Sequence, residues 1–174
     1  LWALYAFSFQ IYFDFSGYTE MARGVGKLLG FELMENFRAP YFATNIRAFW
    51  ARWHISLSFW VRDYLYFPLG GARVSNAKVV RNLLICMLII GIWHGASMRW
   101  VIYGTCMGSV MSIERWMQRM RGGKDFATTI PKKAISWLVV FNYWSFTSLF
   151  VRSQTRDDVK GVLGVYDLEG SWAR

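Results

Sequence analysis

Residues 82–98 read NLLICMLIIGIWHGASM, a run of seventeen residues without a charged side chain between two arginines. A helix that crosses a membrane needs about twenty predominantly apolar residues, within a range of roughly 17–25. Three further charge-free runs cover residues 1–13, 100–113 and 134–151. The runs at 1–13 and 100–113 are short enough to be buried core helices, but four runs in one chain favour a membrane protein. We therefore predict an all-α, multi-pass fold with about four membrane helices and short interfacial amphipathic helices.

The composition agrees with this class. Of 174 residues, 55% are apolar and 18% are charged, whereas ordinary globular domains carry roughly 25% charged residues. This balance excludes intrinsic disorder, which requires low hydrophobicity. Cys86 and Cys106 lie inside apolar runs, which indicates buried thiols rather than a disulfide framework. We expect one membrane domain over residues 1–174, a fragment of a longer membrane protein, because the chain opens inside an apolar run without signal-peptide features.

Two further helices are predicted between the apolar runs. Ser16 or Gly17 is a suitable N-cap for a helix over about residues 18–29, and Gly30 suits its C-terminal end. Small residues recur there at a spacing that allows membrane helices to approach closely, although chance explains it equally well: Ala22, Gly26 and Gly30. The second helix covers residues 46–64 and is amphipathic and rich in Trp and Arg, as expected at a membrane interface. Its apolar face comprises Ile46, Phe49, Trp50, Trp53, Leu57, Trp60, Val61 and Tyr64.

Basic residues set the predicted topology. They gather in residues 73–81 and in a loop over residues 114–133, and the positive-inside rule places both segments on the cytoplasmic side. His94 then lies toward the outer half of the bilayer, the run at 134–151 leads outward, and a polar tail follows at 152–174. The net charge of +9 is explained by this topology and by anionic lipid. We predict no nucleic-acid partner, because the basic residues are spread among apolar spans.

His54 and His94 are the only histidines, and both sit in apolar surroundings. An ionisable group at membrane depth is a functional candidate, because burying it is costly. A neutral imidazole can accept a proton from a hydroxyl group, although a lone buried histidine is more often a hydrogen-bonded core residue. Two histidines without a third ligand predict no metal site. The sequence contains no Walker A motif and no GxSxG elbow.

Several blocks in order resemble the membrane-bound O-acyltransferase family. They are YFDFSGYTEMA at 12–22, ENF at 35–37, FWARWHISLSFWVRDYLY at 49–66, PLGG at 68–71, RNLL at 81–84 and WHGA at 93–96. The likeness is strong over residues 8–116 and is greatest to the bacterial branch that contains alginate O-acetyltransferase and the D-alanyl transfer protein of teichoic acid synthesis.

The resemblance implies that this chain is a C-terminal-side fragment of a longer helical membrane protein. Such a protein would move an acyl group, acetyl as the first candidate, from a cytoplasmic thioester donor to a hydroxyl of an exported polysaccharide such as alginate. The donor would be acetyl-CoA or an acyl carrier, with no tightly bound cofactor. The family's catalytic histidine matches His94, and the second histidine of this branch matches His54. The expected location is the bacterial inner membrane, and a periplasmic acyltransferase partner is a further expectation.

The remaining site residues have supporting roles in this hypothesis. The oxyanion of the tetrahedral intermediate needs a hydrogen-bond donor, which His54 or the indole N–H of Trp93 would supply. Arg52, Arg62 and Asp63 would hold the His54 helix or contact donor phosphates, and the structural role is the stronger of the two. Asp14, in the first motif block, completes the set. A covalent route through a serine is the weaker alternative: Ser16, Ser56 or Ser58.

Three alternatives stay open. In the first, the protein transfers D-alanyl or another acyl group to a cell-wall polymer. A non-enzymatic membrane scaffold or transporter would use both histidines structurally. A peripheral basic protein is weaker, because salt would release it whereas integral spans need detergent.

Overall fold

The computed structural model describes residues 2–124 and 128–153. Within these ranges the chain is all-helical and has no β-strand, only one isolated antiparallel bridge between Phe37 and Trp53. The predicted all-α class is therefore confirmed. The helices in chain order are α1 (Trp2–Leu28), η1 (Pro40–Phe42), α2 (Ile46–Trp50), α3 (Ile55–Val61), the π-helical turn η2 (Arg62–Tyr66), α4 (Asn76–His94), α5 (Met98–Met120) and α6 (Ile130–Arg152).

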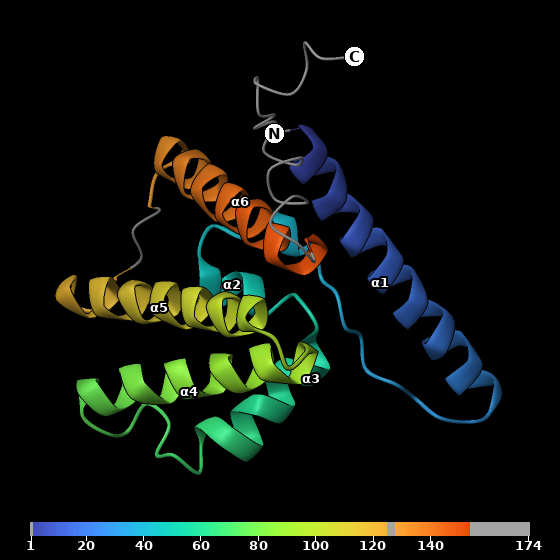
Figure 1. Ribbon diagram of the computed structural model, residues 1–174, viewed down its shortest axis with the longest axis horizontal. Helices are drawn as coiled ribbons and strands as arrows, with labels where there is room; N and C mark the ends of the chain where they lie inside the picture. The colour runs from blue at the N-terminus through green and yellow to red at the C-terminus, as the bar shows by residue number, and fades with distance from the viewer. Residues whose placement is uncertain (1, 125–127, 154–174) are drawn as a thin grey trace, which may run out of the picture.

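The long helices form an open assembly (Figure 1). α4 and α5 lie side by side as an antiparallel pair, α6 packs against both α5 and α1, and the short helix α2 packs against α5. The C-terminal half of α1 extends away from the other helices (Figure 1). This half exposes large apolar side chains: Tyr18, Met21, Val25 and Leu28. Such a surface suits lipid or further helices rather than water.

Glycine allows α4 and α5 to approach at backbone distance. A Cβ atom on Gly91 would lie 2.3 Å from the carbonyl oxygen of Trp100, and one on Gly104 would lie 2.5 Å from that of Met87. A Cβ on Gly108 would be 3.0 Å from backbone of α4. Small residues at a helix interface permit this close contact, and sequence inspection did not single out Gly104 or Gly108.

The small-residue series predicted at residues 22–30 does not form a helix–helix contact of this kind among the described residues. A Cβ atom on Gly26 of α1 would lie 3.0 Å from the side chain of Leu33, in the segment that follows this helix, and Ala22 is exposed. Among the residues that the structure describes, this series packs against no other helix. Gly30, with φ +81°, follows the end of α1, which confirms the predicted stop.

The predicted helix start at Ser16 or Gly17 is wrong. α1 continues through both positions, and the Ser16 hydroxyl donates to the carbonyl oxygen of Phe13 at 3.5 Å within the helix. A serine that bonds back in this way is accommodated in a helix interior. The predicted run at 1–13 and the predicted helix at 18–29 are therefore parts of one helix.

The predicted single amphipathic helix over residues 46–64 is also wrong. A left-handed backbone conformation at His54, with φ +43°, separates α2 from α3, and η2 follows. The predicted apolar face is nevertheless largely buried, in its members Ile46, Phe49, Trp50, Trp53 and Val61. Trp60 and Tyr64 are exposed.

The helix boundaries shorten the predicted basic loop. α5 runs to Met120 and α6 begins at Ile130, so most of residues 114–133 is helical. By length and composition, α4 and α6 could each cross a membrane. The predicted four spans stay a prediction. Of the polar tail at 152–174, residues 154–174 lie outside the described part.

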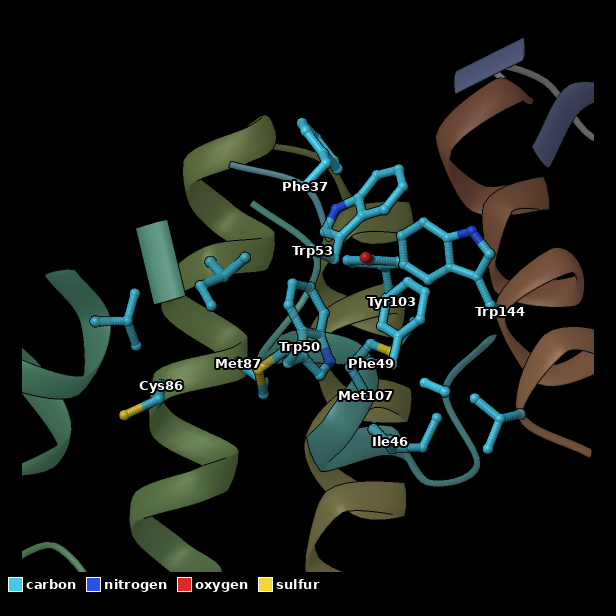
Figure 2. Packing of buried hydrophobic residues seen from close by; sticks show 14 of the residues in the cluster. Phe37, Ile46, Phe49, Trp50, Trp53, Cys86, Met87, Tyr103, Met107 and Trp144 are labelled. Atoms are coloured by element: carbon cyan, nitrogen blue, oxygen red, sulfur yellow. The ribbon is translucent and has the colours of Figure 1, made fainter. Parts of the chain in front are cut away.

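An aromatic core joins α2, α5 and α6 (Figure 2). Trp53 packs against Phe37 with ring centroids 5.0 Å apart and against Trp144 of α6 at 4.6 Å. Phe49 of α2 lies 4.4 Å from the same Trp144 ring. Aromatic pairs at such distances add to the stabilisation from burial, so this core fixes the segment that carries His54.

Tyr41 connects this segment to two long helices. Its hydroxyl donates to the carbonyl oxygen of Ser8 in α1 and accepts from Nε1 of Trp144 at 3.1 Å. Nε1 of Trp137 donates to the carbonyl oxygen of Tyr41 at 2.6 Å. Burial raises the pKa of Tyr41, so the phenol remains a neutral donor.

Candidate active site

His94 is the last residue of α4, and its side chain is exposed among aromatic rings. The imidazole stacks on Trp100 of α5, with centroids 5.0 Å apart and an interplanar angle of 21°. Trp93 lies edge-on at 4.8 Å, and Tyr103 is perpendicular at 6.4 Å. Stacking limits rotation of the imidazole while leaving the ring open to a substrate.

Two glycines near His94 in the chain leave room for Trp100 to pack against it. Gly91, one turn before His94, lets the backbone of Trp100 approach α4. A Cβ on Gly95, directly after His94, would lie 2.6 Å from Nε1 of Trp100. Glycines beside His94 in the sequence predict that a substrate or another backbone comes close. Gly91 does admit the backbone of Trp100, and Gly95 admits the indole that supports the histidine.

His54 is held in an unusual backbone conformation. Non-glycine residues rarely adopt positive φ, and the strain costs of order 1–3 kcal/mol unless the surroundings determine it. Here the surroundings are backbone hydrogen bonds on both sides: Arg38 N–H donates to the Arg52 carbonyl at 3.0 Å, and Ile55 N–H donates to the Asn36 carbonyl at 3.1 Å. Strained residues cluster at functional sites, and this strain turns His54 out of the helix that the sequence predicted.

The side chain of Asn36 orients the Ser56 hydroxyl that contacts His54. Its Oδ1 accepts from the backbone N–H of Ser56 at 3.0 Å and from the Ser56 hydroxyl at 2.7 Å. A backbone N–H can only donate, so this atom of Asn36 is the oxygen. The Ser56 proton is therefore committed to Asn36, so in the 3.5 Å contact between Ser56 Oγ and His54 Nδ1 the hydroxyl oxygen is available only as an acceptor. This arrangement favours the proton on Nδ1 of a neutral His54. Nε2 of a neutral His54 is then an acceptor.

The two histidines lie within electrostatic range of each other. Burial lowers the pKa of His54, and the positive charge that His94 can carry lowers this pKa further. Phe15 of α1 packs edge-on to the His54 ring at 4.8 Å. Phe15 of α1 therefore contacts His54, whereas His94 of α4 acts on it electrostatically, and both burial and the charge of His94 favour a neutral His54.

The other predicted site residues differ in how they relate to the two histidines. Trp93 is adjacent, with 63% of its surface exposed. Arg52 contributes its main-chain carbonyl to the pairing that supports His54. Asp14 is exposed on α1 and forms no hydrogen bond or ion pair with the described residues.

Arg62 and Asp63 pair with each other rather than with His54. Nε and Nη2 of Arg62 donate to the two carboxylate oxygens at 2.7 and 3.0 Å, and this bond lowers the pKa of Asp63. The guanidinium also covers the Phe59 ring at 4.4 Å. The exposed pair belongs to the η2 turn, and the two predicted roles, holding the His54 helix or contacting donor phosphates, stay predictions.

The three serines considered as nucleophiles are all engaged as donors. Ser56 donates to Asn36, Ser58 to the Trp50 carbonyl at 3.1 Å, and Ser16 to its own helix. None is activated by a base in this arrangement. No group of three His, Cys, Asp or Glu side chains that could hold a metal ion occurs in residues 2–124 and 128–153.

Sequence reasoning missed three residues of the site: Asn36, Trp100 and Phe15. Two of them lie inside motif blocks, ENF at 35–37 and YFDFSGYTEMA at 12–22, so attention to the polar member of ENF could have found Asn36. Trp100 gave no such signal, because it lies outside every block.

Comparisons with known proteins identify the family. The family model of MBOAT, the membrane-bound O-acyltransferase family, matches residues 1–152. A peptidoglycan O-acetyltransferase of Helicobacter pylori is 42% identical over 166 residues, which cover 95% of this chain and 31% of the relative. A probable alginate O-acetylase of Pseudomonas putida is 52% identical over 148 residues, 84% of the chain and 27% of the relative.

A teichoic acid D-alanyltransferase of Bacillus subtilis is 35% identical over 157 residues, 83% of the chain and 40% of the relative. The chain thus spans less than half the length of these relatives. Both kinds of relative expected from the bacterial branch are present, together with a peptidoglycan acetyltransferase that the sequence analysis did not consider. With the family model covering nearly the whole described chain, this protein belongs to the membrane-bound O-acyltransferase family.

Proposed function

We propose that this chain carries the histidine centre of an O-acyltransferase that transfers an acetyl group from a thioester donor to a hydroxyl of an exported polysaccharide. The observations that carry the proposal are that His94 stacks on Trp100, that His54 is held beside Ser56, and that the two histidines lie within electrostatic range of each other. Membership of the family supports the reaction class. The named relatives support acetyl as the acyl group, with D-alanyl as the second candidate.

In the proposed reaction His94 removes the proton from the acceptor hydroxyl as its oxygen attacks the thioester carbonyl. A carbon–oxygen bond forms and a tetrahedral oxyanion develops. The carbon–sulfur bond then breaks, and His94 returns the proton to the leaving thiolate. Ester and free thiol are the products, and no other reactant is needed.

The oxyanion requires a hydrogen-bond donor. A neutral His54 with its proton on Nδ1 presents only an acceptor at Nε2, which makes it a poor partner for an anion. The indole N–H of Trp93, which can only donate, suits this role. We therefore assign the oxyanion to Trp93 and give His54 the task of orienting the acceptor hydroxyl through Nε2.

We place the chain in the bacterial inner membrane, with four spans formed by α1, α4, α5 and α6. The basic residues at the start of α4, the end of α5 and the start of α6 would face the cytoplasm. His94, at the opposite end of α4, would lie toward the outer surface. The donor, acetyl-CoA or an acyl carrier, would approach from inside, and the polysaccharide or a periplasmic acyltransferase partner would accept the group outside.

The test compares exported polymers from a strain that lacks the full-length protein and from the same strain complemented with it. Mass spectrometry of the purified polymers measures acetyl and D-alanyl esters separately. We expect acetyl esters on an exported polysaccharide to disappear and return with complementation. Loss of D-alanyl esters instead would show that D-alanyl is the group transferred. Unchanged esters on every polymer would exclude the enzymatic function.

The Asn36 side chain provides a prediction about His54. Replacing Asn36 with alanine frees the Ser56 hydroxyl to donate to Nδ1, which moves the proton of His54 to Nε2. We expect kcat to fall about tenfold or more with little change in KM. Asn36→Asp keeps both hydrogen bonds to Ser56 and adds a negative charge, so it should retain more activity while raising the pKa of His54.

The acidic limb of the pH–rate profile distinguishes this role from a structural one. For Asn36→Asp the limb should move to higher pH, because a protonated His54 becomes more favourable. If Asn36→Ala and Asn36→Asp lose the same activity at an unchanged limb, Asn36 does not act through His54.

A further inference from the structure

A second site lies away from the histidines, where α2, α5 and α6 meet. The cavity there has a volume of about 420 Å³. It is lined by the start of α2, the C-terminal part of α5 with the connection that follows, and the first turns of α6. The ends of α5 and α6 that border it carry basic residues.

The polar end of this cavity is cationic. Four basic side chains line it, against one carboxylate, that of Glu114: Arg47, Arg121, Lys124 and Lys133. Glu114 is already engaged, because its carboxylate accepts the backbone N–H groups of Ile46 at 2.6 Å and Arg47 at 3.4 Å. The remaining excess of positive charge suits an anionic group.

The other end of the cavity is apolar and open. Ile113, Ile135 and Val139 contribute to its lining and are exposed, and Val140 forms its buried side. Lys133 and Val140 are seven residues apart on α6, about 10 Å at the rise of a helix. A ligand that fits both ends carries an anionic head and a hydrocarbon chain.

We propose that this cavity binds an anionic phospholipid, with its phosphate among Arg47, Lys124 and Lys133 and an acyl chain along Ile135 and Val139. Because α6 is basic in its first turn and apolar beyond it, a membrane would place the cations at headgroup level and the apolar lining in hydrocarbon. A soluble phosphate compound uses only the cationic end and leaves the apolar lining uncovered. The proposal does not depend on the acyl-transfer chemistry.

The test uses the full-length protein purified in detergent and native mass spectrometry of the lipid that it retains. Three probes are offered: phosphatidylglycerol, phosphatidylcholine with the same acyl chains, and inorganic phosphate as a competitor. We expect phosphatidylglycerol to be retained in preference to phosphatidylcholine and to resist displacement by phosphate. A Lys124→Gln, Lys133→Gln variant should bind phosphatidylglycerol about tenfold more weakly or worse.

The matched control removes the same charge from the same end of the helix bundle but outside the cavity, in an Arg73→Gln, Lys78→Gln variant. It should retain phosphatidylglycerol like the wild type. Val139→Trp provides an uncharged test, because it fills the apolar end at an exposed position and should also reduce retention. Equal binding of both lipids, equal loss in the two charge variants, or full displacement by inorganic phosphate would each overturn the proposal.

Discussion

Replacing His94 with alanine in the full-length protein is expected to reduce acyl transfer about a thousandfold, the range in which general bases contribute. The physical reason is the loss of the group that takes the acceptor proton at the moment of attack. The protein should still fold and insert, because His94 is the exposed last residue of α4 and forms no hydrogen bond with the described residues. Polymer ester content and the initial rate with purified donor measure the effect.

Two companion variants make this prediction specific. His94→Gln retains a side chain of similar reach and hydrogen-bonding capacity but cannot carry the proton, so it should be as inactive as alanine. Trp93→Phe keeps an aromatic ring and removes only the N–H, so it should lose about a hundredfold through the oxyanion. Membrane levels are checked by immunoblot. Normal ester content in His94→Ala at normal protein level would remove His94 from the mechanism and favour the non-enzymatic scaffold.

The second large effect is expected at Gly91. A methyl group there would stand 2.3 Å from the carbonyl oxygen of Trp100, and backbone cannot move aside as a flexible side chain can. Overpacking of this kind costs typically about 1–3 kcal/mol. We therefore expect Gly91→Ala to lower the free energy of unfolding by about 2 kcal/mol. It should also lower activity, because Trp100 supports the His94 ring.

The measurement is thermal unfolding of the detergent-purified protein, followed by tryptophan fluorescence. Gly24→Ala is the matched control, because Gly24 lies inside α1 and a Cβ there meets nothing within 4 Å. Alanine is favoured over glycine in a helix interior by up to about 1 kcal/mol, so this variant should be at least as stable as the wild type. If Gly91→Ala unfolds at the same temperature as Gly24→Ala, the close contact of α4 and α5 is not a determinant of stability.

Local composition was sufficient to predict several features. The charge-free runs at 82–98 and 134–151 mark α4 and α6, since a hydrophobic run reveals a long apolar helix without reference to its partners. Gly30 marked the end of α1 for an equally local reason, the left-handed conformation that glycine accepts. The motif blocks indicated the family that the comparisons then identified.

Features that depend on distant residues escaped this reasoning. The periodicity of residues 46–64 favours one helix, yet the pairing of residues 36–38 with residues 52–55 breaks it at His54. The close approach of Gly91 to Trp100, and the hydrogen bonds by which Asn36 orients Ser56 beside His54, also arise from contacts between separate elements. Helix propensity and hydropathy are properties of neighbouring residues within one element, whereas the orientation of each histidine follows from hydrogen bonds and packing between separate helices and loops.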